Sequence, residues 1–470
     1  MLAADRRFDV AIIGSGFSGS LLAWVLASQG RRVIVIDAAK HPRFAIGESS
    51  TPIADLLLRH IGDVYSLPAL QQLSTFGGWQ ASFPELACGR KRGFSYYQHR
   101  KGEAFSDDDE HCRSMMAAAS ADDDSADTHW YRHDVDQFFF QQAVAAGCDA
   151  LELATVEDIE LGQTNKLILS SGESVESSWL IDASGRSGVV ANKLSLPSKT
   201  SELRTNTRSV FGHFVGVGSW KQFCAEQELC TDKDPFDCDD SAQHHLLDDG
   251  WIWMLRFNND VTSVGWTHRS SNPVPLKTLG GADHYPSLAK LLDAAKLISE
   301  PGVISSGRLQ RLYDPVVNHR CLLMPTAACT IDPLHSTGIA HGVSGVMRVA
   351  EVLLSGGDDE RLQNYRRDVI EEAKLIDQLV SLSYDAMDDF PRFTAACMLY
   401  FCAAIACEEQ IIAGQIPRQF WNAGNAGFLD VVDRFPQLTI GEIRTAIEPW
   451  NVAGLMDPGA MNRYAYTATK

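Results

Sequence analysis

The stretch Asp9-Val-Ala-Ile-Ile-Gly-Ser-Gly-Phe-Ser-Gly19 indicates how the first part of this 470-residue chain folds. Its apolar run Val10–Ile13 is typical of a buried parallel strand, and three glycines follow it at G-x-G-x-x-G spacing. The next residues predict a helix that ends by Gly30, and a second apolar run then ends at Asp37. Strand, glycine turn, helix, strand and acid stand in the order that a dinucleotide-binding unit requires.

Each part of this pattern has a role in binding a dinucleotide. Gly14 makes the tight turn, Gly16 lets the backbone approach a pyrophosphate, and Gly19 lets the helix pack on the strand. The N-terminus of the helix faces the phosphates, and Asp37 accepts a hydrogen bond from a ribose hydroxyl. A glycine triplet alone often marks only a turn, but the strands, helix and acid around it favour a dinucleotide site.

Composition narrows the function. The formal net charge of −19 argues against binding to nucleic acid or to an anionic membrane surface. The 11 cysteines form no C-x-x-C pairs, so they predict free thiols in a reducing cytoplasm and give no support for a metal site. No signal peptide precedes the first strand, and the longest apolar run, Thr394–Cys407, is too short to span a bilayer. We therefore expect a cytoplasmic protein in which this run forms a buried helix.

Later segments predict a second sheet and a helical end. Its strands are expected at Phe94–Tyr97, Val210–Val215, Trp251–Phe257 and Val261–Trp266. The predicted fold class is α/β, with a dinucleotide-binding domain made of residues 1–80, 130–200 and 300–355. An antiparallel β-sheet substrate domain, residues 81–129 and 201–299, interrupts it, and a helical C-terminal region, residues 356–470, follows.

Four motifs together resemble a known family. They are G-S-G-F-S-G at the N-terminus, Gly47-Glu-Ser-Ser-Thr-Pro52, Ile181-Asp-Ala-Ser-Gly185 and Asp332-Pro-Leu-His-Ser-Thr-Gly338. Their order resembles that of group A flavoprotein monooxygenases and, more closely, of flavin-dependent halogenases of the tryptophan-halogenase superfamily, over roughly residues 8–355. The resemblance implies an FAD-binding Rossmann-like domain of the GR2 or p-hydroxybenzoate hydroxylase type.

The resemblance also implies which residues bind the cofactor. The predicted FAD-binding residues are Gly14, Gly16, Phe17, Ser18, Gly19, Asp37, Glu48, Ser49, Arg132, Asp182, Asp332, Thr337, Gly338 and Ile339. Chloride or bromide is expected near Thr337 and Gly338, where backbone amides precede a helix. No second G-x-G-x-x-G motif follows, so we expect a separate flavin reductase to supply reduced FAD. From the residues alone, the segment around Glu48 could equally be a helix cap.

Lys91 lies where halogenases of this kind carry their essential lysine, within Arg90-Lys-Arg-Gly-Phe-Ser-Tyr-Tyr97. A lysine in a dry tunnel can hydrogen-bond or capture hypohalous acid, formed from halide and a flavin C4a-hydroperoxide, and present it to an aromatic ring. We predict this catalytic role for Lys91; a surface lysine in a basic cluster is the alternative.

Two tryptophans extend the resemblance. The segment Trp251-Ile-Trp-Met-Leu-Arg256 resembles the halogenase signature W-x-W-x-I-P, although Leu255 replaces isoleucine and Arg256 replaces proline. Trp251 and Trp253 are predicted to line the substrate tunnel, with ordinary core packing as the alternative.

Two departures from the family pattern bear on substrate and cofactor. His335 stands where tryptophan halogenases have a glutamate, and we predict that it is catalytic in its neutral form. Free tryptophan becomes a weaker candidate substrate for this reason. Thr326 stands where this class usually has an aspartate, so a hydroxyl would hold the ribityl chain of FAD.

The leading hypothesis is an FADH2-dependent halogenase that acts on an electron-rich aromatic compound of phenol, pyrrole or indole type. The substrate is a small molecule or is borne by a carrier or a peptide. The alternative is a flavin-dependent monooxygenase of the same fold that hydroxylates an aromatic ring or a peptide-borne side chain. A polyprenyl-reducing flavoprotein and a non-catalytic flavin-fold protein are more distant possibilities.

Overall fold

The first sheet is built around the N-terminal strand. In the computed structural model, which describes residues 7–269, 282–300 and 302–465, β1 lies within an eight-stranded sheet of order β18-β19-β10-β1-β2-β7. β1 runs parallel to β10 and β2, and β9 and β8 extend the sheet from β10 as an antiparallel pair. The strands are β1 (Arg7–Ile13), β2 (Val33–Ile36), β7 (Asp149–Leu151), β8 (Val156–Glu160), β9 (Asn165–Leu169), β10 (Ser174–Asp182), β18 (Val316–Asn318) and β19 (Cys321–Leu323). The predicted order of strand, glycine turn, helix and strand is confirmed.

Helix α1 (Phe17–Ser28) connects β1 to β2 and is buried from Phe17 to Ala27. It packs against α5 (Arg132–Ala145) and α10 (Gly338–Leu354). Because protein covers α1 on every side, its sequence is apolar all round rather than amphipathic. The other helices before α10 are α2 (Pro52–Tyr65), α3 (Pro68–Gln72), α4 (Phe76–Ser82), α6 (Val189–Lys193), α7 (Trp220–Glu226), α8 (Pro286–Leu292) and α9 (Pro325–Ala328).

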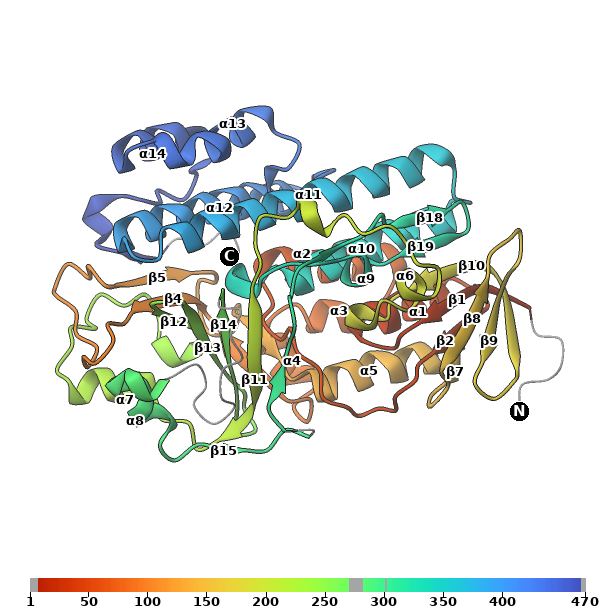
Figure 1. The fold of residues 1–470 in the computed structure, drawn as a ribbon, viewed down its shortest axis with the longest axis horizontal. Helices are drawn as coiled ribbons and strands as arrows, with labels where there is room; N and C mark the ends of the chain where they lie inside the picture. The colour runs from red at the N-terminus through yellow and green to blue at the C-terminus, as the bar shows by residue number, and fades with distance from the viewer. Residues whose placement is uncertain (1–6, 270–281, 301, 466–470) are drawn as a thin grey trace.

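The second sheet has nine strands in the order β15-β11-β14-β13-β12-β4-β5-β21, with β16 beside β11. Figure 1 shows it next to the parallel sheet and its helices. The strands are β4 (Gly93–Gln98), β5 (Ser114–Ala118), β11 (Arg208–Val215), β12 (Ser241–Leu247), β13 (Gly250–Arg256), β14 (Val261–His268), β15 (Lys296–Leu297), β16 (Ile304–Ser305) and β21 (Arg463–Tyr464). The four predicted strands are confirmed as β4, β11, β13 and β14. Residues 270–281 of the predicted substrate domain lie outside the described residues.

The sheet differs from the predicted antiparallel one at β12. This strand, Ser-Ala-Gln-His-His-Leu-Leu, was not predicted, because its polar residues are buried on both faces and no alternation marks it. It lies between β13 and β4 and runs parallel to β4. Two small two-stranded sheets complete the fold: β3 (Cys88–Lys91) with β6 (Asp127–Trp130), and β17 (Arg311–Leu312) with β20 (Cys329–Thr330).

The C-terminal helices run along one side of both sheets (Figure 1). They are α11 (Asp359–Asp385), α12 (Phe390–Ile412), α13 (Ala426–Arg434) and α14 (Ile440–Ile447). By length and composition α12 could cross a membrane, but 78% of its apolar window is buried inside the protein, so the predicted buried helix is confirmed. The chain then returns to the second sheet, where β21 pairs with β5. The predicted helical C-terminal region is confirmed, with the two-residue strand β21 near its end as an addition.

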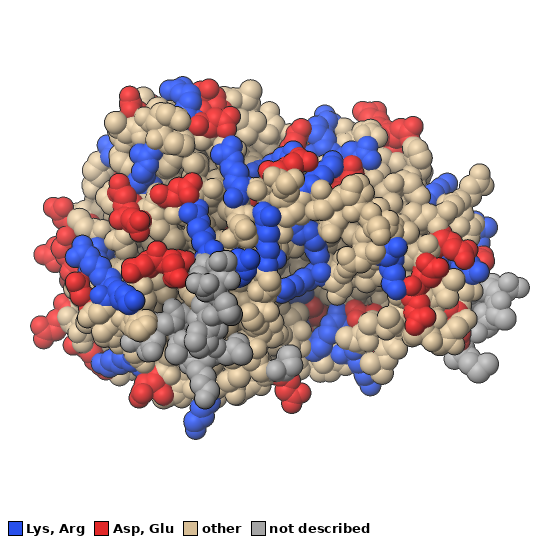
Figure 2. All heavy atoms as spheres, in the orientation of Figure 1, with Lys and Arg blue, Asp and Glu red and all other residues tan. Residues whose placement is uncertain are grey.

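Charged side chains are mixed over the face shown in Figure 2. Lys and Arg form a band across its middle, and Asp and Glu lie beside them. The excess of 60 acidic over 41 basic residues is therefore not gathered in one patch on this face.

Candidate active site

A cavity of ≈750 Å³ runs from the glycine turn after β1 to the second sheet. Gly14 and Asp37 lie at one end, and Trp251, Trp253 and His244 lie at the other. The predicted residues that line it are Gly14, Gly16, Phe17, Ser18, Asp37, Glu48, Ser49, Arg132, Trp251, Trp253, Asp332, Thr337, Gly338 and Ile339. The lining of this cavity does not include Gly19, Lys91, Asp182 or His335. A volume of this size suits a large cofactor.

The three glycines of the turn have different surroundings. Gly14 has φ +102°, and a Cβ there would lie 2.5 Å from the carbonyl oxygen of Ala183. A Cβ on Gly19 would lie 2.1 Å from the carbonyl oxygen of Gly14. A Cβ on Gly16 would meet nothing closer than 3.7 Å, because Gly16 faces the open cavity. The protein's own packing thus requires Gly14 and Gly19, whereas Gly16 leaves room for a ligand such as the pyrophosphate of FAD.

Asp37 lies just after β2 with its carboxylate held in place. Its Oδ2 accepts hydrogen bonds from the backbone N–H of Ser15 at 2.7 Å and from the Ser15 hydroxyl at 2.8 Å. The Arg43 guanidinium forms an ion pair with the same oxygen at 2.9 Å. Burial opposes ionisation, but Arg43 and the hydrogen bonds outweigh it, so the pKa of Asp37 is lowered. The carboxylate is therefore charged and suited to accept a ribose hydroxyl. Arg43, six residues after the acid, was not predicted from the sequence.

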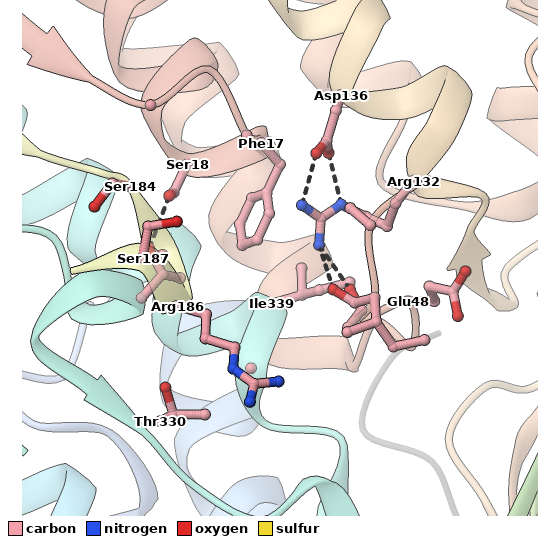
Figure 3. Close-up of a pocket in the computed structure, with 18 of the residues that line it drawn as sticks. Phe17, Ser18, Glu48, Arg132, Asp136, Ser184, Arg186, Ser187, Thr330 and Ile339 are labelled. Atoms are coloured by element: carbon pink, nitrogen blue, oxygen red, sulfur yellow. Dashed lines mark hydrogen bonds and ion pairs between the residues drawn. The ribbon is translucent and has the colours of Figure 1, made fainter. Parts of the chain in front are cut away.

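Arg132 connects α5 to the loop that carries Glu48. Its guanidinium donates to both carboxylate oxygens of Asp136, at 2.6 and 2.7 Å, and lies 4.7 Å from the ring centre of Phe17. Its Nη1 donates to the carbonyls of Ile46 and Gly47, at 3.0 and 3.1 Å. Figure 3 shows Phe17, the Arg132–Asp136 pair and the loop around one side of the cavity. Asp136, one helical turn after Arg132, was not predicted from the sequence.

The loop before α10 lines the cavity together with residues of the second sheet. The Asp332 carboxylate accepts hydrogen bonds from the hydroxyls of Thr207 at 2.6 Å and Tyr384 at 2.9 Å. Burial raises the pKa of Asp332 to about 6 despite these bonds. Thr337 is the N-cap of α10 and Gly338 its first residue, so the N-terminus of this helix faces the cavity. An anion is favoured at such a place.

Thr326 lies beside the cavity, as predicted for the residue that replaces the usual aspartate. Its hydroxyl is 2.9 Å from the hydroxyl of Ser18, and either oxygen can donate. Asp182, in contrast, accepts hydrogen bonds from the backbone N–H groups of Ser184 and Val190. Asp182 therefore shapes the glycine turn after β10 rather than lining the cavity.

Trp251 and Trp253 form the wall at the second sheet, with ring centres 5.8 Å apart. The indole N–H of Trp251 donates to the hydroxyl of Tyr384, and that of Trp253 donates to Ser263. Gly265 is paired with Trp253 across β13 and β14, and a Cβ there would lie 2.1 Å from the indole ring. The strand is therefore shaped to present this tryptophan to the cavity.

Lys91 is fully buried behind this wall. It pairs with Asp127 across β3 and β6, and its Nζ donates to the carbonyl of Ser50. The Nζ lies 4.0 Å from the ring centre of Phe94, which in turn stacks at 6.1 Å on the cavity residue His244. Burial lowers the pKa of Lys91 to about 8, against the opposing effect of three buried carboxyl groups. These belong to Asp55, Asp127 and Glu408.

His335 is also one layer away from the cavity. Its ring stacks on Tyr400 of α12 at 4.3 Å between ring centres, and its Nε2 lies 3.3 Å from the hydroxyl of Ser383. Burial lowers the pKa of His335 to about 3, so the imidazole is neutral. Neutrality is the form that its predicted catalytic role requires, and that role stays a prediction.

A Rossmann-like domain joined to a substrate sheet, with an elongated cavity between them, defines the flavoproteins that hold FAD against a second sheet. The chain belongs to the tryptophan halogenase family, whose profile matches residues 125–392, more than half of its length. A profile of NAD(P)-binding Rossmann-like domains matches residues 12–60. The predicted resemblance is confirmed, and the protein is an FAD-dependent enzyme of the flavin-dependent halogenase type.

Named relatives agree with this assignment. The chain is 30% identical to tetracycline 7-halogenase of Kitasatospora aureofaciens over 87% of this chain and 75% of that one. It is 28% identical to monodechloroaminopyrrolnitrin halogenase PrnC of Pseudomonas fluorescens, over 92% and 77% of the two chains. The crystal structure of halogenase PltM in complex with phloroglucinol and FAD has the same fold, with a TM-score of 0.85 at 23% identity over 98% and 100% of the two chains.

Proposed function

We propose that this halogenase transfers chlorine or bromine to an electron-rich aromatic ring of phenol, pyrrole or indole type, and that Lys91 presents the halogen to the ring. The observation that carries the proposal is the position of Lys91. It is dry, it lies one side-chain layer from the large cavity, and its pKa is lowered to about 8 by burial. A buried amine of this kind can hydrogen-bond or capture a small electrophile.

The large cavity fits FAD. Gly16 leaves its backbone open to a pyrophosphate, the ionised Asp37 suits a ribose hydroxyl, and the hydroxyls of Ser18 and Thr326 suit a ribityl chain. Reduced FAD, supplied by a separate flavin reductase, would provide the oxygen activation that converts halide into hypohalous acid. We place the halide at Thr337 and Gly338, because the N-terminus of α10 offers backbone N–H groups to an anion.

The residues around Lys91 control its protonation. Asp55 and Asp127 share a hydrogen bond between their carboxyl groups, and burial raises the pKa of Asp55 well above its ordinary value. Asp55 therefore keeps its proton and donates it to the Asp127 oxygen. Burial raises the pKa of Asp127, opposite Lys91, to about 7, so its carboxyl group is partly ionised near neutral pH and in that form keeps part of the lysine protonated. Near its pKa the amine can bind hypohalous acid both as a donor and as a nucleophile.

The relatives support the substrate class without fixing the compound. Two relatives are named for halogenating tetracycline and monodechloroaminopyrrolnitrin, and PltM was crystallised with phloroglucinol. Electron-rich rings need less activation than free tryptophan. A chain with His335 in place of the glutamate of tryptophan halogenases is therefore suited to such rings. The partners would be a flavin reductase and an aromatic substrate, either a small molecule or one borne by a carrier or a peptide, in the cytoplasm.

A second candidate is hydroxylation of the same kind of ring by a monooxygenase mechanism. The observation that favours it is Arg256, which replaces the proline of the halogenase signature. Its guanidinium donates to the carbonyls of Val217 and Gly218 and so ties β13 to the segment before α7. The two functions predict different products from one assay.

The test is a reconstituted reaction. The protein would be mixed with FAD, a flavin reductase, NADH, oxygen and bromide, and offered phenols, pyrroles and indoles. Mass spectrometry should detect the bromine isotope doublet with the wild type and with Lys101→Ala, an exposed lysine control. Lys91→Ala should abolish the doublet. A gain of one oxygen without bromine, unaffected by halide, would replace the halogenase proposal with the hydroxylase.

A further inference from the structure

A second, much smaller cavity lies between α12 and the strands β4 and β5 of the second sheet. We call it the α12 cavity; its volume is ≈30 Å³. Aromatic side chains of Phe94, Tyr400 and Phe401 line it, together with Thr51 and Glu408. The Lys91 Nζ lies 4.0 Å from the centre of the Phe94 ring, so Phe94 contacts both the lysine and the cavity. The α12 cavity is therefore one side chain away from Lys91, which does not itself line it.

Two polar groups face the α12 cavity without partners. Thr51 is the N-cap of α2, yet its hydroxyl makes no capping bond, and its buried Oγ1 has no hydrogen-bond partner within the described ranges. Glu408 is 4% exposed, and within those ranges none of the interactions on its carboxyl is a hydrogen bond. Buried polar groups in folded proteins are nearly always hydrogen-bonded, and leaving one unpaired costs free energy. The Thr51 hydroxyl therefore calls for an occupant that can hydrogen-bond, and the Glu408 carboxyl group beside it can bind the same occupant.

The charge around the α12 cavity restricts that occupant. Burial raises the pKa of Glu408 to about 8, Asp127 raises it further, and Lys91 opposes them. The carboxyl group is thus near its point of ionisation, where it can accept or donate a proton in a hydrogen bond. A second carboxylate or a phosphate at this place would be repelled by Glu408 and Asp127. A neutral group that carries an O–H or N–H hydrogen matches the cavity.

We propose that the α12 cavity receives the hydroxyl or N–H edge of the aromatic substrate, and that Glu408 hydrogen-bonds this group and sets the preference for such rings. The inference rests on the proposed function, which puts the ring beside Lys91. A volume of ≈30 Å³ matches one hydroxyl group and not a whole ring. Binding of the ring therefore moves the side chains that line the cavity, of which Tyr400 and Phe401 come from α12.

The test measures binding separately from turnover. Phloroglucinol and its tri-O-methyl ether would be titrated into FAD-loaded protein by calorimetry, since the ether keeps the ring but cannot donate. The wild type should bind phloroglucinol about tenfold more tightly than the ether, the discrimination expected of one net hydrogen bond. Glu408→Leu should lose this preference, whereas Glu408→Gln, which keeps an acceptor oxygen, should retain part of it. Glu409→Gln, the adjacent and less buried residue, should keep it.

The outcomes separate this inference from the proposed function. If Glu408→Leu folds, as its melting temperature will show, and still prefers phloroglucinol as the wild type does, the α12 cavity holds only water and the inference is wrong. Equal binding of phloroglucinol and the ether to the wild type, or no binding of either, also overturns it. If the preference depends on Glu408 but bromination never occurs, the site stands and the halogenase proposal fails.

Discussion

The buried ion pair of Arg132 and Asp136 should hold both the fold and the cofactor, and Asp136→Ala tests this. The pair joins two side chains of α5 that are 7% and 1% exposed, with N–O distances of 2.6 and 2.7 Å. The substitution leaves the guanidinium buried without a counter-charge. Arg132 would keep only its two bonds to the carbonyls of Ile46 and Gly47.

The magnitude follows from the geometry. Breaking a buried ion pair by removing one partner costs about 3–5 kcal/mol of the free energy of unfolding. We expect about 3 kcal/mol, the lower end, because Arg132 also faces the cavity and keeps its carbonyl partners. FAD affinity should fall at least about tenfold, because the loop from Ile46 to Ser49 loses its anchor. The matched control is Asp134→Ala, which removes a half-exposed contact between Asp134 and His133 on the same helix. It should lower the free energy of unfolding by less than about 1 kcal/mol.

The assay has two readouts. Urea unfolding of the FAD-free protein, followed by tryptophan fluorescence, gives the free energy of unfolding, and quenching of flavin fluorescence gives the Kd for FAD. The double variant Arg132→Leu with Asp136→Leu should regain most of the stability but not the FAD affinity, because an apolar pair replaces the buried charges. The reasoning is refuted if Asp136→Ala costs no more stability than Asp134→Ala.

Three further predictions concern the turn, the ribose acid and the lysine. Gly19→Ala should lower the free energy of unfolding, measured in urea, by about 2 kcal/mol or more, because its Cβ would lie 2.1 Å from a backbone oxygen. The control Gly441→Ala, which has open space around it in α14, should leave this free energy unchanged or raise it. Asp37→Asn should raise the Kd for FAD at least about tenfold in the same fluorescence titration, and an unchanged Kd would contradict the ribose contact. Lys91→Met should remove a rise of wild-type stability with pH, because burial lowers the pKa of Lys91 from 10.5 to about 8. Between these two pKa values only the unfolded wild-type chain keeps the proton, so wild-type stability rises with pH there and the stability of Lys91→Met does not; a stability difference between the two proteins that is independent of pH would refute this.

The sequence predicts those parts of the site that are local in the chain. The glycine turn, Asp37 and the segment before α10 carry their geometry in their own spacing, and all of their predicted residues except Gly19 and His335 line the large cavity. Arg43 and Asp136, which hold Asp37 and Arg132, are also close in sequence. They were missed because a basic or acidic residue at such a distance is common on any helix or loop.

Contacts between residues that are far apart in the chain could not be predicted from the sequence. His213 pairs with Glu48 at 2.6 Å across 165 residues, and Tyr384 of α11 joins Asp332 to Trp251. Nothing in the local pattern of α11 or α12 marks Tyr384 or Tyr400 as neighbours of the site, because on each helix they read as ordinary core positions. The stacking of His335 on Tyr400, which keeps that histidine out of the large cavity, depends on such a contact.

The layer between the FAD cavity and Lys91 bears on the choice between halogenation and hydroxylation. His244 lines the cavity and stacks on Phe94, and the Phe94 ring centre lies 4.0 Å from the Lys91 Nζ. A group transferred directly at the flavin needs its acceptor inside the cavity, whereas a small neutral molecule such as hypohalous acid can pass one layer of side chains. Opening the layer with His244→Ala should therefore let hypohalous acid escape, which a halogen scavenger in the solution would detect. The control is His245→Ala. His245 is the next residue on β12, its ring is hydrogen-bonded to His99 away from the cavity, and its substitution should release no hypohalous acid. Equal release of hypohalous acid from both variants would mean that this layer does not direct it to Lys91. The position of Lys91 would then no longer favour halogenation over hydroxylation.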